Sequence, residues 1–172
     1  GVGNSFYTIK VNGEKIKKEV ELNNHEEAFE TLVKELEENN VVESLDEIEG
    51  IGHRVVQGGD YFDKTVVIDD EVLAKIDELS SLAPLHNPAA VTGIKAAKDV
   101  FPNAVQTAVF DTAFHQTMPK ENFLYALPIS WYTDLKVRRY GAHGTSHKFV
   151  SQRMNEILKR DGTKIITCHI GN

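Results

Sequence analysis

The chain has 172 residues, of which 41% are hydrophobic and 26% charged, a composition typical of a globular protein with a buried core. Its formal net charge of −7 argues against nucleic acid or an anionic membrane as the main partner. Its single cysteine, Cys168, excludes an internal disulfide, and the sequence contains no apolar run of membrane-spanning length. We therefore expect a cytoplasmic protein that has no nucleic-acid or membrane partner.

The first forty residues predict a β-hairpin followed by a helix. Two runs of alternating hydrophobicity flank the pair Asn12-Gly13, which is the strongest short-range hairpin signal. Asn24 and Glu27 then have the spacing of a capping box, in which a side chain closes the first turn of a helix. The pair Asn39-Asn40 is expected to end that helix.

The remainder of the chain alternates predicted strands with predicted helices. The strands are expected over residues 48–56, 66–68, 103–111 and 163–169, and the helices over residues 72–79, 88–100 and 145–158. Thr145 or Ser146 is expected to cap the last helix. This alternation indicates an α/β fold with a largely parallel central sheet, to which the hairpin would add an antiparallel edge. We find no repeat or linker and expect one domain.

Polar residues gather where the predicted strands end, which is where open α/β sheets bind ligands. Arg54 lies within an apolar strand, so it is either a structural ion pair or a guanidinium directed at a carboxylate or phosphate. Asp111 ends the strand at 103–111 and is either a cap or turn residue, or an acid at the rim of a site. His86 precedes Asn-Pro and is most simply a turn residue.

Glycines and histidines surround the start of the last helix. Gly141 and Gly144 flank His143 and permit a tight loop. The N-terminus of the helix that follows would favour an anion, and Gly171 could form a comparable phosphate-binding turn. A metal-binding or hydrolase domain is an alternative of another class, with the histidines at 86, 115, 143 and 169, although no clustered zinc motif is present. The residues alone indicate an anion-binding sheet edge that performs phosphoryl transfer or hydrolysis.

Five short motifs occur in order between about residue 48 and residue 172: GHRVVQGG, PLHNP, VFDTAFHQTMP, YGAHGTSH and HIGN. Together they resemble the signature series of the acetate kinase family, within the acetate and sugar kinase, Hsp70 and actin superfamily. The resemblance implies an α/β, ribonuclease H-like (actin-like ATPase) domain with a mixed central sheet flanked by helices. It further implies that residues 1–172 form the single substrate-side N-terminal domain of a two-domain kinase whose first strand and C-terminal domain are missing.

The implied activity is reversible transfer of the ATP γ-phosphate to acetate, which gives acetyl phosphate and ADP. Mg²⁺ and ATP would be required, with the metal ligands outside residues 1–172, and the full-length protein would be a homodimer. A propionate or butyrate kinase of the same superfamily is the alternative. We expect residues 1–172 by themselves to be inactive.

The resemblance also assigns roles to individual residues. Arg54, Asp111 and His143 would be catalytic, and the substrate would contact Arg54, His86, Val56, Leu85 and Ala142. His169, Gly171 and Asn172 would bind the nucleotide phosphates. Two positions depart from the family pattern: Gln57 replaces an expected histidine, and Ala142 replaces a frequent phenylalanine and would enlarge the acyl pocket.

Overall fold

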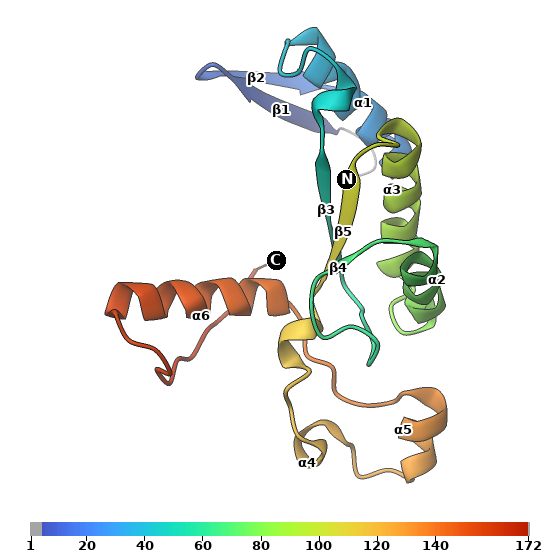
Figure 1. Cartoon of the computed structure of the whole chain (residues 1–172), viewed down its shortest axis with the longest axis vertical. Helices are drawn as coiled ribbons and strands as arrows, with labels where there is room; N and C mark the ends of the chain where they lie inside the picture. Colours follow the sequence, from blue (N-terminus) through green and yellow to red (C-terminus); the bar gives the residue numbers. More distant parts are fainter. Residues whose placement is uncertain (1–4, 172) are drawn as a thin grey trace. The chain divides into compact units, whose positions relative to one another are not determined.

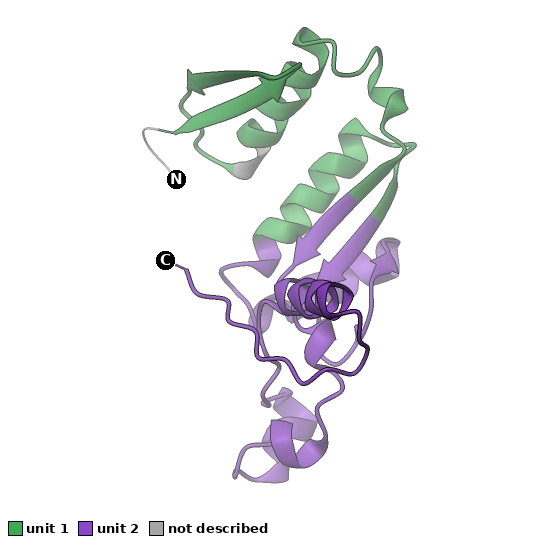
Figure 2. Cartoon of the chain, turned by 90° about the vertical axis from the view of Figure 1, so that its left-hand side faces the viewer, with its two compact units in different colours: residues 1–51, 89–106 green, residues 52–88, 107–172 purple. Residues whose placement is uncertain are grey.

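The computed structural model describes residues 5–171, so the prediction for Asn172 lies outside the described residues. The chain divides into two compact units, coloured separately in Figure 2. Unit 1 comprises residues 1–51 and 89–106, and unit 2 comprises residues 52–88 and 107–172. Every described residue that the sequence assigns to the site belongs to unit 2.

Unit 1 begins with the predicted hairpin. Strands β1 (Phe6–Val11) and β2 (Glu14–Glu19) pair antiparallel, with Ile9 opposite Ile16. Asn12 and Gly13 both have positive φ, as a tight two-residue hairpin turn requires. The hairpin prediction is confirmed, but the hairpin forms a sheet of its own and is not an edge of the central sheet (Figure 1). Its charged second strand is largely exposed and offers little apolar surface for packing.

The predicted first helix is present as α1 (His25–Glu38). The Asn24 side chain accepts a hydrogen bond from the Glu27 amide at 2.8 Å, and Asn39 caps the C-terminus. Phe29 of this helix contacts Phe101 edge to face, with the ring centroids 5.9 Å apart. A 3₁₀ turn, η1 (Leu45–Glu47), follows. The capping prediction is therefore confirmed at both ends of α1.

The central sheet has three strands in the order β3-β5-β4: β3 (Gly50–Val55), β5 (Val105–Phe110) and β4 (Val66–Val67). The Val105 amide donates to the Glu49 carbonyl, and the Asp111 amide donates to the Val55 carbonyl. Residue numbers therefore increase in the same direction along β3 and β5, as in a parallel pair. Strand β4 pairs antiparallel with β5. The sheet is therefore mixed, as the resemblance implied.

The helices include the three that the sequence predicts over residues 72–79, 88–100 and 145–158, and two short ones between residues 120 and 135 that it does not predict. They are α2 (Asp70–Glu78), the 3₁₀ turn η2 (Leu79–Ser81), α3 (Asn87–Val100), the 3₁₀ turn η3 (Ala113–His115), α4 (Lys120–Phe123), α5 (Ile129–Leu135) and α6 (Gly144–Leu158). In unit 2, Phe62 stacks on Phe110 with ring centroids 4.2 Å apart, and Val55, Ile76 and Ala108 are fully buried. This core fixes the ends of β3 and β5, where the predicted site residues lie.

Two predictions in the C-terminal part are wrong. Helix α6 begins at Gly144 with His143 as its N-cap, so neither Thr145 nor Ser146 is the cap. The segment 163–169 keeps an alternating exposure pattern but forms no strand, because none of the described strands lies beside it to supply backbone hydrogen bonds. None of the described helices combines the length and apolarity needed to cross a membrane.

Glu35 gives unit 1 a testable pH dependence. Its buried carboxylate accepts hydrogen bonds from Lys18 and Tyr7, and from Asn39 at 2.9 Å. The Lys18 ammonium foremost, followed by the Tyr7 hydroxyl, holds the pKa of Glu35 below its ordinary value of 4.5. A lowered folded-state pKa stabilises the protein above the unfolded-state pKa, and this contribution is lost as the pH falls through the folded-state value.

We predict that Glu35→Gln lowers the free energy of unfolding at neutral pH and flattens its decline toward acid. Denaturant unfolding at neutral pH and at about pH 3.5 measures both effects. Glu30→Gln, at an exposed position of the same helix, is the matched control and should keep the wild-type decline. Identical pH profiles for Glu35→Gln and the wild type would contradict the assignment.

Candidate active site

The centre of the site is an ion pair between the ends of two adjacent strands. Arg54 comes from β3 and Asp111 directly follows β5. The Arg54 Nε donates to Asp111 Oδ1 at 3.1 Å and an Nη to Oδ2 at 2.6 Å, a bidentate arrangement. The Asp111 side chain is 2% exposed, whereas that of Arg54 is 60% exposed. Hydrogen bonding to Asp111 raises the pKa of Arg54, so this guanidinium is permanently charged.

The start of α6 packs directly onto Asp111. The Gly144 amide donates to the Asp111 carbonyl at 2.8 Å, and the Thr145 hydroxyl donates to Oδ1 at 3.1 Å. A Cβ on Gly144 would lie 2.2 Å from that carbonyl oxygen, so only glycine permits the approach. His143, the residue before, has φ +52° and makes no side-chain cap bond. Asp111 therefore supplies the acceptors that an N-cap residue normally supplies.

A buried polar network holds the neighbouring turns. The fully buried Asn87 side chain accepts from the Gln57 amide at 3.1 Å and donates to the Gln57 carbonyl at 3.0 Å. The Gln57 side chain in turn accepts from the Gly59 amide at 2.9 Å, and the Gly58 amide donates to the Thr112 hydroxyl at 3.0 Å. The residue that departs from the family pattern, Gln57, is thus part of the support of the β3 turn.

Four histidines lie near the start of α6. The rings of His143 and His169 stack with centroids 4.1 Å apart, and His169 Nδ1 is 3.0 Å from the Ser146 hydroxyl. His115 Nε2 is 3.0 Å from the Ala142 carbonyl, and His147 Nδ1 is 2.7 Å from the Thr167 hydroxyl. The segment that contains His169 is therefore held against α6 by side-chain contacts.

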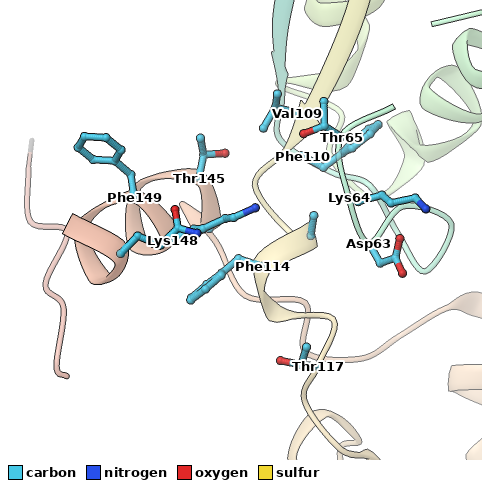
Figure 3. A pocket seen from close by; sticks show the side chains of 13 residues that line it. Asp63, Lys64, Thr65, Val109, Phe110, Phe114, Thr117, Thr145, Lys148 and Phe149 are labelled. Carbon is cyan, nitrogen blue, oxygen red and sulfur yellow. The ribbon is translucent and has the colours of Figure 1, made fainter. Parts of the chain in front are cut away.

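The remaining predicted residues are distributed along the same unit without forming one enclosed pocket. Val56 is half-buried after β3, Leu85 is 85% exposed, and His86, Ala142 and Gly171 are exposed. A pocket of about 300 Å³ lies instead between α6, η3, β5 and the segment 63–65 (Figure 3). Thr145 and Gly144 line it, but Arg54, Leu85 and His86 do not. The structure thus brings together Arg54 with Asp111 and His143 with His169.

Several residues of this arrangement escaped the sequence analysis. Asn87 and Thr112 carry the network, and Thr145, expected only as a possible helix cap, contacts Asp111 instead. Their signal in the sequence is weak, because a hydroxyl or amide beside a helix start is normally a local cap. Tyr140 also contributes locally: burial raises its pKa to about 12, and its hydroxyl donates to the Lys136 carbonyl at 2.8 Å.

The described residues contain no cluster of three or more side chains of the types that bind metals. In this part of the chain, no three His, Cys, Asp or Glu side chains group closely enough to hold a metal ion. A Cβ on Gly171 would meet open space. What the arrangement offers is a fixed carboxylate, a charged and accessible guanidinium, and an exposed imidazole.

Comparison with known proteins agrees with the motifs. The acetokinase family model matches residues 1–172. The acetate kinases of Macrococcus caseolyticus and Bacillus mycoides are 50% and 55% identical to this chain over its whole length. The chain spans 44% of the length of each of these two relatives. A solved propionate kinase from Francisella tularensis superposes with a TM-score of 0.83 at 46% identity, covering 92% of this chain and 40% of that one. The Porphyromonas gingivalis acetate kinase gives 0.81 at 44% identity, covering 92% and 41%.

These matches extend over the hairpin and first helix, which by themselves carried no family signal, and they support the actin-like ATPase fold class. The identities far exceed what a shared fold alone would give, and the solved relatives cover nearly all of the chain. The chain therefore belongs to the acetokinase family.

Proposed function

We propose that residues 1–172 are the single, substrate-side N-terminal domain of an acetate kinase, which transfers the ATP γ-phosphate reversibly to acetate and gives acetyl phosphate and ADP. The observation that carries the proposal is the bidentate Arg54–Asp111 pair beside His143, at the strand ends of a chain in this family. Curated relatives at about half identity bear the name acetate kinase, which supports the same activity.

Arg54 is suited to binding an anion. A guanidinium has five N–H donors, of which Asp111 accepts two, so three remain for a ligand. Because the Arg54 side chain is 60% exposed, these donors are accessible, while the pair with Asp111 fixes the plane of the group. Arg54 thus binds and orients the acetate carboxylate or the transferring phosphoryl group.

Asp111 and His143 complete the arrangement. Transfer passes through a loose, anionic transition state, so it depends on positioning and on positive charge more than on a covalent nucleophile. Asp111 holds Arg54 in place from a buried position, and the exposed His143 ring can donate to an equatorial oxygen of the phosphoryl group. Gly141 has a left-handed backbone of its own, and Gly144 allows the close approach of α6 to Asp111.

The full-length protein is proposed to require ATP and Mg²⁺, with His169, Gly171 and Asn172 near the nucleotide phosphates, and to act in the cytoplasm as a homodimer. Because the described residues lack a metal-ligand set, the metal is proposed to bind through other parts of the protein. The substrate contacts expected of Val56, Leu85, His86 and Ala142 belong to the same proposal.

We predict that Arg54→Ala and Asp111→Asn each lower kcat of the full-length enzyme at least about a hundredfold, because the first removes the charged donors to the reacting groups and the second removes the charge that holds Arg54 in place. A coupled assay of ATP-dependent acetyl phosphate formation measures the loss. Arg153→Ala, which removes an exposed arginine that pairs only with Glu156 on α6, should keep the wild-type rate. A near-normal rate for either site variant would refute the role assigned to that residue.

Propionate kinase is the second candidate, favoured by the Francisella tularensis structure and by the small side chain at position 142. We predict that Ala142→Phe lowers kcat/KM for propionate relative to acetate by about fivefold or more, since one methylene in a pocket is worth ~1–3 kcal/mol. Measuring kcat/KM for acetate, propionate and butyrate in both proteins tests this. An unchanged ratio would show that position 142 does not set acyl length, and a wild type that prefers propionate would favour the second candidate.

Residues 1–172 alone should form no acetyl phosphate, because the chain spans 44% of the length of its acetate kinase relatives and the proposal divides the site between two domains. The same coupled assay, with the full-length protein as positive control, measures this. Turnover by the isolated chain would contradict the proposed division of the site between two domains.

A further inference from the structure

The two oxygens of the Asp111 carboxylate are not equivalent. Oδ1 accepts from Arg54 Nε at 3.1 Å and from the Thr145 hydroxyl at 3.1 Å, whereas Oδ2 accepts from the Arg54 Nη alone, at 2.6 Å. A carboxylate oxygen has about two acceptor directions. Oδ1 therefore has both acceptor directions filled by protein donors, while Oδ2 accepts the short, charge-assisted bond from Arg54.

The backbone of Asp111 is also fixed from both sides. Its amide donates to the Val55 carbonyl of the neighbouring strand at 3.0 Å, and its carbonyl accepts from the Gly144 amide at 2.8 Å. This leaves rotation of the side chain as the main freedom of the residue. Arg54 alone does not fix the rotation of the Asp111 side chain, because the Arg54 side chain is itself 60% exposed.

Thr145 removes the remaining freedom from a rigid support. It is the second residue of the fifteen-residue helix α6, whose first turn carries no acidic residue and whose N-cap, His143, forms no side-chain cap bond. The positive end of this helix is complemented by Asp111, and the hydroxyl of Thr145 holds one carboxylate oxygen toward the helix.

We propose that Thr145 is a positioning residue for phosphoryl transfer: its hydroxyl holds Oδ1 of Asp111 against α6, so that the carboxylate keeps Arg54 in place and the free donors of Arg54 are presented to the reacting groups. The inference rests on the proposed function and adds to it a residue that does not touch the substrate. Its action is exerted through Asp111.

The test compares Thr145→Val, which keeps the shape and removes the hydroxyl, with Thr145→Ser, which keeps the hydroxyl, in the full-length protein. Thr145→Val should lower kcat about tenfold to hundredfold, the value of a hydrogen bond to a charged group, while KM for acetate and ATP changes less than about threefold. Thr145→Ser should stay within about threefold of the wild type. Ser151→Ala, which removes another α6 hydroxyl that donates only to the Lys148 carbonyl, should change nothing.

A double-mutant cycle separates a positioning role from a general structural one. In an Asp111→Ala background the Thr145→Val change should alter kcat by less than about twofold, because the group through which it acts is gone. The proposal would be overturned by a full additional loss of kcat in that background or by equal impairment of Thr145→Ser and Thr145→Val. It would equally be overturned by a wild-type kcat for Thr145→Val, or by a Thr145→Val protein that does not fold.

The same experiments distinguish the inference from the proposed function. A full-length wild type that forms no acyl phosphate from acetate, propionate or butyrate refutes the proposed function. An active wild type with an unaffected Thr145→Val variant refutes only the positioning role.

Discussion

The site depends on the constraint that a buried carboxylate must be paired. Asp111 is 2% exposed at the end of β5, and an unpaired charge in such a place would cost several kcal/mol. Arg54 and Thr145 pair it, and both contacts can form only if β3, β5 and the start of α6 meet at one point. One aspartate thus determines where three elements of unit 2 come together.

Local features of the fold could be predicted because local physics decides them. The Asn12-Gly13 turn, the Asn24 cap and the helix pattern through residues 88–100 depend on residues a few positions apart, and the structure contains each one. The strand ends followed from hydrophobic runs, which also placed Arg54 and Asp111 at the edge of the sheet. For each residue the sequence left a structural and a functional role open, and the structure shows that they are partners in one ion pair.

The features that could not be predicted depend on partners far away in the sequence. Residues 163–169 have the alternation of a strand, but alternation does not supply a neighbouring strand. Thr145 has the residue type of an N-cap, yet its hydroxyl bonds to Asp111, thirty-four positions earlier. Asn87 is the first residue of α3, but its side chain also links the Gln57 turn to the Ile76 carbonyl, a role that depends on residues distant in the sequence.

The exposure of the paired arginine explains how one contact can serve both stability and chemistry. A fully buried Arg54 would satisfy Asp111 but present no donors to a ligand, whereas an unpaired exposed arginine would lose rotamer freedom on binding, at a cost of about 0.5–1.5 kcal/mol for such a side chain. Two of the five N–H donors of Arg54 bond to Asp111, and the other three remain for a ligand. Much of the loss of rotamer freedom therefore occurs during folding and not on binding. Because Thr145 holds the carboxylate of Asp111 and Gly144 holds its backbone carbonyl, the rigidity of α6 is passed to the guanidinium through Asp111. The acidic residue is thus the anchor of the cation that is proposed to bind the anionic substrate.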